Sequence, residues 1–225
     1  MSEILQVFAG AWQYALARLP ELGQATRDHL ALAGIALGVS LVLAVPLGVW
    51  TSRSRLASLA VMNTINTLRV IPSLAVLFLV IPYLGLSTAS AAVALTVLAL
   101  PPLLINTDAA FRSLPPAVLE AARGMGMTPS QVLWRVEFPL ALPVMLTGLR
   151  TAAVEVLSSA TLAAFVGSGG LGVFITRGFA QFDYSILMVG AVPVALLTLA
   201  AEVLLGTLQR AAQPPGLQLS QRSAT

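Results

Sequence analysis

The chain has 225 residues and a net charge of +3; 57% of its residues are hydrophobic, only 9% are charged, and its mean hydropathy is +0.89. Soluble domains carry about 25% charged residues, so too few charges are present to cover a soluble surface, and we expect an integral membrane protein. The chain has no Lys, no Cys and a single His, which excludes a conventional P-loop ATPase and a catalytic thiol, and it has no Arg cluster that would indicate nucleic-acid binding.

The first expected element is an amphipathic helix within residues 1–27, on the periplasmic side. Its hydrophobic side chains recur at roughly helical spacing: Ile4, Leu5, Phe8, Trp12 and Leu16. Such a helix lies in the plane of the membrane interface. A sixth membrane span over residues 1–20 is the alternative.

Runs without charged residues locate the membrane spans, because about 20 apolar residues cross a bilayer as a helix. Leu30–Ser52 is one such run, and Val70–Thr107 is long enough for parts of two spans separated at Pro82–Gly85. We expect an all-α protein with about five spans, near 30–52, 57–82, 88–110, 140–165 and 184–208. They form one membrane domain over residues 28–210.

The distribution of Arg predicts the orientation of these spans, because cytoplasmic loops of membrane proteins carry an excess of positive charge. One side collects most of the Arg residues: Arg53, Arg55, Arg112, Arg123, Arg135, Arg210 and Arg222. We therefore place the N-terminus outside and the C-terminus in the cytoplasm. The tail 211–225 is rich in Pro, Gln and Ser and is expected to be disordered.

The longest hydrophilic segment between spans covers residues 113–139, on the predicted cytoplasmic side. Pro115 and Pro116 favour a helix start, and Gly124 and Gly126 favour a break. Thr128 and Gln131 have the spacing of a capping box at the start of a second helix. The segment is therefore predicted to form a short helix, a Gly bend and another short helix that enters the fourth span.

The same segment resembles the EAA loop of ABC-importer permeases. The matching positions are Glu120, Ala121, Ala122, Gly126, Val136, Phe138 and Pro139, of which Val136 and Phe138 are conservative departures from the family pattern. This resemblance implies a coupling helix that docks into a cleft of a separate ATPase subunit. Small side chains at 121 and 122 would let the partner approach closely, and Gly126 permits unusual backbone angles.

Further stretches, such as residues 71–85 and 100–116, resemble permeases for osmoprotectants such as glycine betaine, choline and carnitine. The resemblance implies a methionine-permease-like core of a type I importer in a bacterial or archaeal cytoplasmic membrane. It also implies an ATPase dimer that binds Mg-ATP, a second permease copy or a paralogue, and an extracytoplasmic binding protein. The chain itself would be no enzyme and hold no cofactor or metal. The alternatives are a methionine or amino-acid importer permease and an ion-coupled secondary transporter.

A Gly-rich run lies at the predicted outer end of the fourth span and contains Gly167, Gly169, Gly170 and Gly172. Its spacing matches a dinucleotide-binding pattern, but its surroundings do not read as a strand–helix–strand unit. We expect a tight re-entrant turn there. A role near the outer gate and a role in packing alone both stay open.

Charged residues within or near the predicted spans are costly and tend to mark pathways or ion pairs. They are Arg69, Asp108, Arg150, Glu155 and Glu202. We hypothesise that Arg69 pairs with Asp108 or Glu155 near the translocation path; a purely structural pair, or a solvated Asp108 at the cytoplasmic interface, is the alternative. His29, at the start of the first span, is expected at the membrane interface.

Overall fold

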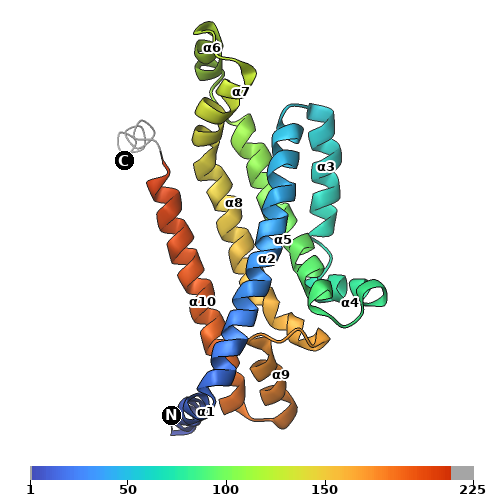
Figure 1. The fold of residues 1–225 in the computed structure, drawn as a ribbon, viewed down its shortest axis with the longest axis vertical. Coiled ribbons are helices and arrows are strands. Elements are labelled where there is room, and N and C mark those ends of the chain that lie inside the picture. Colours follow the sequence, from blue (N-terminus) through green and yellow to red (C-terminus); the bar gives the residue numbers. More distant parts are fainter. Residues whose placement is uncertain (1, 214–225) are drawn as a thin grey trace.

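A computed structural model describes residues 2–213, which fold into helices joined by short turns (Figure 1). In chain order the helices are α1 (Ser2–Ala17), α2 (Leu19–Ser52), α3 (Arg55–Leu68), α4 (Ser73–Leu84), α5 (Thr88–Arg112), α6 (Pro116–Gly124), α7 (Pro129–Val132), α8 (Phe138–Ser159), α9 (Gly172–Gln181) and α10 (Tyr184–Ala211). A π-helical segment, Leu133–Glu137, joins α7 to α8, and a 3₁₀ segment, Ala160–Val166, continues α8.

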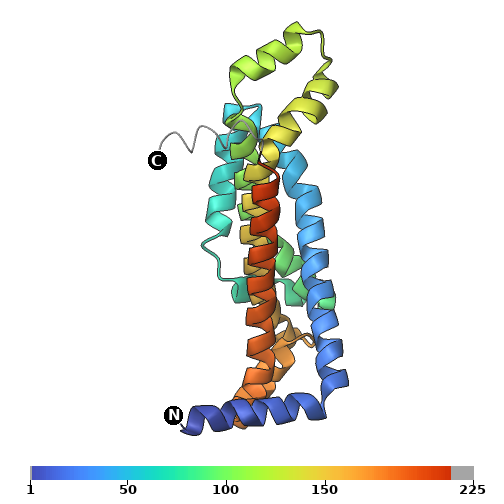
Figure 2. The same ribbon diagram turned by 90° about the vertical axis from the view of Figure 1, so that its left-hand side faces the viewer.

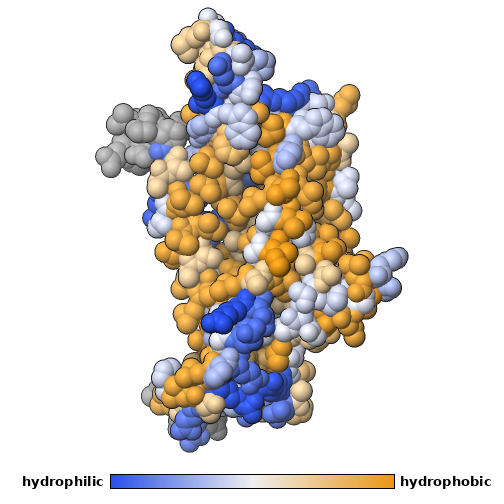
Figure 3. Space-filling model, viewed as in Figure 1, coloured by the Kyte–Doolittle hydropathy of each residue, from blue (hydrophilic) through white to orange (hydrophobic). Residues whose placement is uncertain are grey.

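The long helices α2, α5, α8 and α10 run side by side and form the body of the molecule (Figures 1 and 2). Within the described residues, four helical stretches are long and apolar enough to cross a membrane, and a bent pair raises the number to five. Figure 3 shows the corresponding surface, with hydrophobic residues over the middle and hydrophilic residues gathered towards both ends. The predicted all-α fold with about five spans is confirmed.

The second span differs from the prediction, which was a single helix near residues 57–82. It consists of α3 and α4, which meet at an angle of 94°. Residues 69–72 break the helix because Pro72 disfavours helical angles at the residue before it. At about 1.5 Å per residue, α3 alone spans only about 21 Å, which is less than a hydrocarbon core of about 30 Å.

The start of the first span was also predicted too late. Helix α2 has 34 residues and begins at Leu19, because Pro20 suits the first turn and the charged residues after it still favour helix. Helix α1 lies across the end of the bundle (Figure 2), where Gly10 packs closely on Ser185 of α10 and Tyr14 accepts a hydrogen bond from Arg177 of α9 (3.2 Å). The predicted N-terminal helix therefore exists, and its place on a membrane surface stays a prediction.

Helix α5 is the centre of the bundle and lies between α2 and α8. Each neighbour contacts it at a glycine where a side chain would not fit. A Cβ on Gly48 of α2 would lie 2.6 Å from the Cβ of Thr107, and a Cβ on Gly148 of α8 would lie 2.7 Å from the carbonyl oxygen of Pro102. Small residues at such crossings allow the van der Waals packing that holds helices together in lipid. The predicted disordered tail, 211–225, falls outside the described residues beyond Gln213.

Candidate functional site

The segment 113–139 projects beyond one end of the bundle as a helical hairpin (Figures 1 and 2). Helix α6 has Pro116 in its first turn and ends at Gly124, and Gly126 then adopts a left-handed φ of +81°. A side chain at that position would be strained, so the sharp bend depends on glycine. The predicted order of short helix, Gly bend and short helix is confirmed.

The second arm of the hairpin begins with the predicted capping box. The backbone N–H of Thr128 donates to Oε1 of Gln131 (2.9 Å), and the backbone N–H of Gln131 donates to the Thr128 hydroxyl (3.4 Å). Both bonds satisfy N–H groups that a helix start otherwise leaves free. From there the chain continues without a break through Leu133–Glu137 into α8, so the hairpin and the span form one connected rod.

The hairpin presents some of the motif residues and hides others. Glu120, Ala121 and Gly126 are exposed, whereas Ala122 is only 2% exposed and packs within the loop. Close approach of a partner at Ala121 stays a prediction, whereas Ala122 is not exposed for such a contact. Two large exposed side chains that we had not predicted, Met125 (76%) and Trp134 (63%), add hydrophobic surface to the hairpin.

An ion pair ties the base of the hairpin to the end of α2. Nη1 of Arg53 donates to Oε1 of Glu137 (3.0 Å), and Nη2 contacts the second carboxylate oxygen. Glu137 is buried, and its hydrogen bond raises the pKa of Arg53 above its ordinary value. The guanidinium group also lies over the ring of Phe111, at the end of α5. A bidentate pair of this kind fixes orientation as well as distance.

The remaining motif residues belong to this base. Val136 and Phe138 are half-buried, and Phe138 packs on a small cluster that includes Phe111 and Leu114. The ring of Phe138 lies 5.3 Å from that of Trp134. Pro139 occupies the first turn of α8, where a missing N–H costs nothing.

A second clamp at the same end joins α5 to α2. Nε of Arg112 donates to Asp108 (2.8 Å), and its Nη2 donates to the backbone carbonyl oxygen of Thr51 (2.5 Å) at the end of α2. A cation at a helix C-terminus also interacts favourably with the helix dipole. Asp108 therefore pairs within its own helix, and the hypothesis that Arg69 pairs with Asp108 is wrong.

The Gly-rich run forms the tight turn that we expected. Gly167, Gly169 and Gly170 adopt left-handed φ angles of 70°, 76° and 78°, and a Cβ on Gly172 would collide with the backbone of Thr161. The turn rests on the N-terminal half of α2, beside Asp28 and His29. Its role near a gate stays a prediction.

His29 is fully buried within the protein. Its Nε2 lies 2.9 Å from the carbonyl oxygen of Leu157, and its ring faces Gly170. Its predicted depth at the membrane interface stays a prediction.

The other intramembrane charges form two different arrangements. Arg150 of α8 pairs with Glu202 of α10, a partnership that the sequence did not predict. Arg69 and Glu155 line one cavity of about 170 Å³ between α4, α5 and α8. Within the described residues they form no direct ion pair, so the predicted pairing of Arg69 with Glu155 is not seen either.

Comparison with known proteins identifies the family of the chain. The sequence pattern of the family described as "binding-protein-dependent transport system inner membrane component" matches residues 36–214, which is most of the chain. The chain belongs to this family.

Curated relatives of the permease agree with that assignment. The chain is 36% identical to the choline transport system permease protein OpuBB of Bacillus subtilis over 198 residues, covering 88% of this chain and 91% of that one. It is 37% identical to the osmoprotectant import permease protein OsmW of Salmonella typhimurium over 210 residues, with coverage of 91% and 98%. These are similarities to transport proteins along nearly their whole lengths.

The fold of the permease is that of ABC-importer transmembrane subunits. A solved structure of the MetNI methionine ABC transporter in an inward-facing conformation aligns with a TM-score of 0.74 and 25% identity, covering 87% of this chain and 98% of that chain. The permease is thus a non-enzymatic inner-membrane subunit whose ATPase is a separate chain. The predicted family and methionine-permease-like fold are confirmed.

Sequence reasoning missed the residues that hold the hairpin in place: Arg53, Arg112 and Glu137. A signal was available, since Arg53 directly follows the first predicted span and Glu137 directly precedes the fourth. Opposite charges at the same predicted membrane face are natural partners. Their choice of partner depends on how the helices are arranged around α5, which no local pattern reveals.

Proposed function

We propose that this permease carries osmoprotectants, small quaternary ammonium compounds such as glycine betaine, carnitine and choline. The observation that supports this most directly is similarity along almost the whole chain to permeases whose names specify these compounds, at 36–37% identity. The methionine transporter shares the fold at a lower identity of 25%. A methionine or amino-acid importer is therefore the second candidate.

We infer that the transporter contains two ATPase subunits that bind Mg-ATP, a second permease copy or a paralogue, and an extracytoplasmic binding protein. The chain has no Lys and hence no Walker A motif of its own, which supports a separate ATPase. The exposed face of the hairpin, with Glu120, Ala121 and Met125, supports a docking role for this segment.

The connections of the hairpin suggest how movement would reach the membrane. Its second arm is continuous with α8, the Arg53–Glu137 pair links it to α2, and Arg112 links α2 to α5. A displacement of the hairpin by the ATPase would therefore act on three helices together. Rigid-body motion of such bundles is a common basis of alternating access.

Uptake into proteoliposomes that contain the permease, its ATPase and its binding protein tests this function. Labelled glycine betaine, choline, carnitine and methionine would be supplied with and without internal ATP. We expect ATP-dependent uptake of one or more osmoprotectants. Methionine uptake alone would keep the mechanism and change the substrate, and ATP-independent uptake would contradict the importer assignment.

The matched control is Gly126→Asp, which places a side chain where φ is +81°. A residue forced into such a backbone conformation is strained by roughly 1–2 kcal/mol, so the hairpin bend should distort while the bundle stays folded. We expect this variant to lose uptake and ATPase binding together. Normal uptake by this variant would show that the hairpin bend is not needed for coupling to the ATPase.

A further inference from the structure

Two opposite charges in the membrane-spanning part of the chain lack any direct partner. Arg69 lies at the break between α3 and α4, and Glu155 lies on the face of α8 that looks towards this break. Within residues 4–213 neither side chain has a hydrogen bond or an ion pair, whereas the other intramembrane acids, Asp108 and Glu202, are both paired. Arg69 is exposed and Glu155 is partly buried, so both charges can be reached by a partner from outside the chain.

Both charges line the same cavity, whose volume is about 170 Å³. They are close enough to attract each other across it but do not touch. The rest of the lining is largely apolar and comes from α4 and α5, including Val76, Val97, Leu98 and Pro101. A small chamber with a cation on one wall, an anion on another and apolar side chains between them is complementary to a solute that carries both charges.

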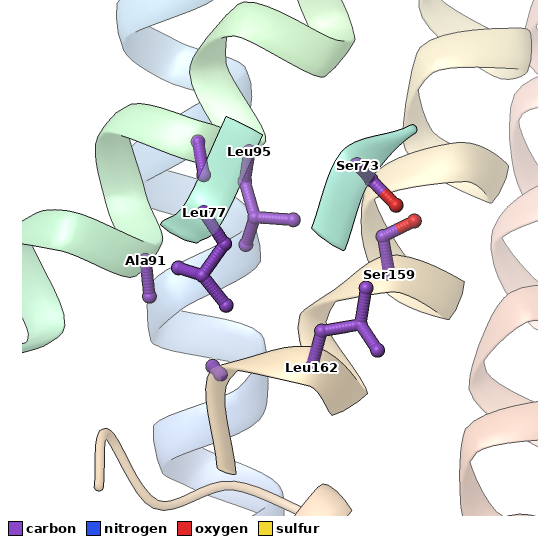
Figure 4. Close-up of a pocket in the computed structure, with 8 residues that line it drawn as sticks. Ser73, Leu77, Ala91, Leu95, Ser159 and Leu162 are labelled. Carbon is purple, nitrogen blue, oxygen red and sulfur yellow. The ribbon is translucent and has the colours of Figure 1, made fainter. Parts of the chain in front are cut away.

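Two other cavities lie nearby: a larger one of about 810 Å³, which Glu155 lines together with Glu202, has no cation in its lining, and the other is too small for a solute. Ser73, Leu77, Ser159 and Leu162 line a pocket at the start of α4, where the hydroxyl groups of Ser73 and Ser159 point towards one another (Figure 4). Its volume of about 10 Å³ holds one water molecule at most. Ser159 lies one helical turn beyond Glu155, so this pocket adds a polar edge next to the charged cavity and cannot itself hold a solute.

The break between α3 and α4 strengthens the positive wall. The first turn of α4 begins at Ser73, close behind Arg69, and its backbone N–H groups carry a partial positive charge. Discontinuous helices of this kind place ion and substrate sites within membrane transporters. The anionic end of a solute in this cavity would meet the guanidinium group of Arg69, next to the break between the two helices.

We propose that the cavity between Arg69 and Glu155 is a binding site for a zwitterionic solute. The carboxylate of the solute binds Arg69, and its quaternary ammonium group binds near Glu155 and the apolar wall. This inference rests on the proposed function for its substrate class, because glycine betaine and carnitine carry both charges. Choline lacks the carboxylate and would use only the Glu155 side.

Direct binding to the permease–ATPase complex, without the binding protein, tests the site. The complex would be placed in nanodiscs of phosphatidylglycerol, so that no zwitterionic lipid headgroup competes, and labelled glycine betaine and choline would be titrated. A hydrogen bond to a charged group corresponds to roughly ten- to hundred-fold in affinity. Arg69→Gln should weaken glycine betaine binding by about that factor and leave choline binding nearly unchanged, whereas Glu155→Gln should weaken both.

The double variant Arg69→Gln with Glu155→Gln separates a ligand site from a structural charge pair. A ligand site predicts that it binds glycine betaine no better than either single variant. Recovery of wild-type binding and transport in the double variant would show a structural pair and overturn the inference. Arg150→Gln and Glu202→Gln are the matched controls, because they remove charges of the bundle that do not line this cavity, and they should keep the preference for glycine betaine over choline.

Two further outcomes keep this inference distinct from the proposed function. If the wild-type complex transports osmoprotectants with ATP but binds no glycine betaine in the absence of the binding protein, the inference fails and the function stands. If the wild-type complex transports none of them, the function fails, and glycine betaine binding that depends on Arg69 would still support the site. Binding of a phosphatidylcholine headgroup in preference to the free solutes would assign the cavity to lipid and overturn the inference.

Discussion

At the scale of single residues, the ion pair between Arg53 and Glu137 is unequal. The side chain of Glu137 is only 3% exposed, whereas that of Arg53 is 46% exposed. Loss of the Arg would leave a buried carboxylate without a partner, while loss of the Glu would leave a cation that water can still reach. The cost of breaking a pair depends mainly on which charge stays buried.

We therefore predict that Arg53→Gln destabilises the permease more than Glu137→Gln. The free energy of unfolding is expected to fall by about 2–3 kcal/mol in the Arg variant and by about 1 kcal/mol in the Glu variant. Thermal unfolding of the purified permease in detergent measures both, with the exposed neighbour Arg55→Gln as control. Equal losses, or a larger loss for Glu137→Gln, would contradict this account of the pair.

Much of the hairpin could be predicted because its signals are local. A Gly bend at 126 and a capping box at Thr128 and Gln131 each depend on a few neighbouring residues, and both are present. Ala122 was misjudged because the side of a short helix that faces inward depends on how the hairpin folds back. The contact of His29 with Leu157 could not be predicted because it follows from the packing of whole helices, and Asp108 was misjudged because its partner, Arg112, is one choice among nearby charges.

At the scale of elements, hydrophobic runs predicted where helices occur but not how they cross. The four long helices were expected from hydrophobic stretches, whereas the 94° bend between α3 and α4 was not. Pro72 was visible in the sequence, but prolines also lie inside α2, α5, α8 and α10 without breaking them. Whether a proline bends or breaks a span depends on the neighbours that satisfy its freed carbonyl group.

Close crossings at α5 lead to a prediction at this scale. Gly148→Ala would place a Cβ 2.7 Å from both the Pro102 carbonyl oxygen and the Asn106 Cβ, so α8 and α5 would have to move apart. We expect the free energy of unfolding to fall by about 1–3 kcal/mol, as at other overpacked sites. Thermal unfolding in detergent is again the measurement.

Gly23→Ala is the matched control for this crossing. Gly23 lies in α2, and a Cβ added there would meet no atom within 4 Å, so the change removes only the flexibility of glycine. An unchanged or slightly raised unfolding temperature is expected, since Ala favours helix over Gly by about 0.5–1 kcal/mol. If both variants behaved alike, the closeness of the α5–α8 crossing would have no energetic consequence.

At the scale of the whole molecule, the two ends of the bundle are chemically different. The hairpin and the clamps formed by Arg53 and Arg112 lie at one end, and α1, α9 and the Gly-rich turn lie at the other (Figure 1). The Arg distribution assigns the hairpin end to the cytoplasm. Neither the fold nor its relatives establish that orientation, so the topology stays a prediction that needs its own measurement.

The absence of Cys makes this topology directly testable, because a single introduced thiol is the only one in the chain that a reagent can label. We predict that Met125→Cys, in the exposed hairpin, reacts with a membrane-impermeant thiol reagent in inside-out vesicles but not in intact cells. Phe182→Cys, at the exposed turn between α9 and α10, should show the reverse pattern. Both side chains are highly exposed, so differences in labelling report the side of the membrane and not burial.

Addition of the ATPase extends the same measurement to docking. If the hairpin is the contact surface, the ATPase should protect Met125→Cys in inside-out vesicles and leave the labelling of Trp50→Cys, at the exposed end of α2, unchanged. Labelling of Met125→Cys from outside would reverse the predicted orientation of the whole chain. Correct sidedness without protection would keep the orientation and remove the hairpin from the interface, because a thiol buried in a protein–protein contact cannot react at its normal rate.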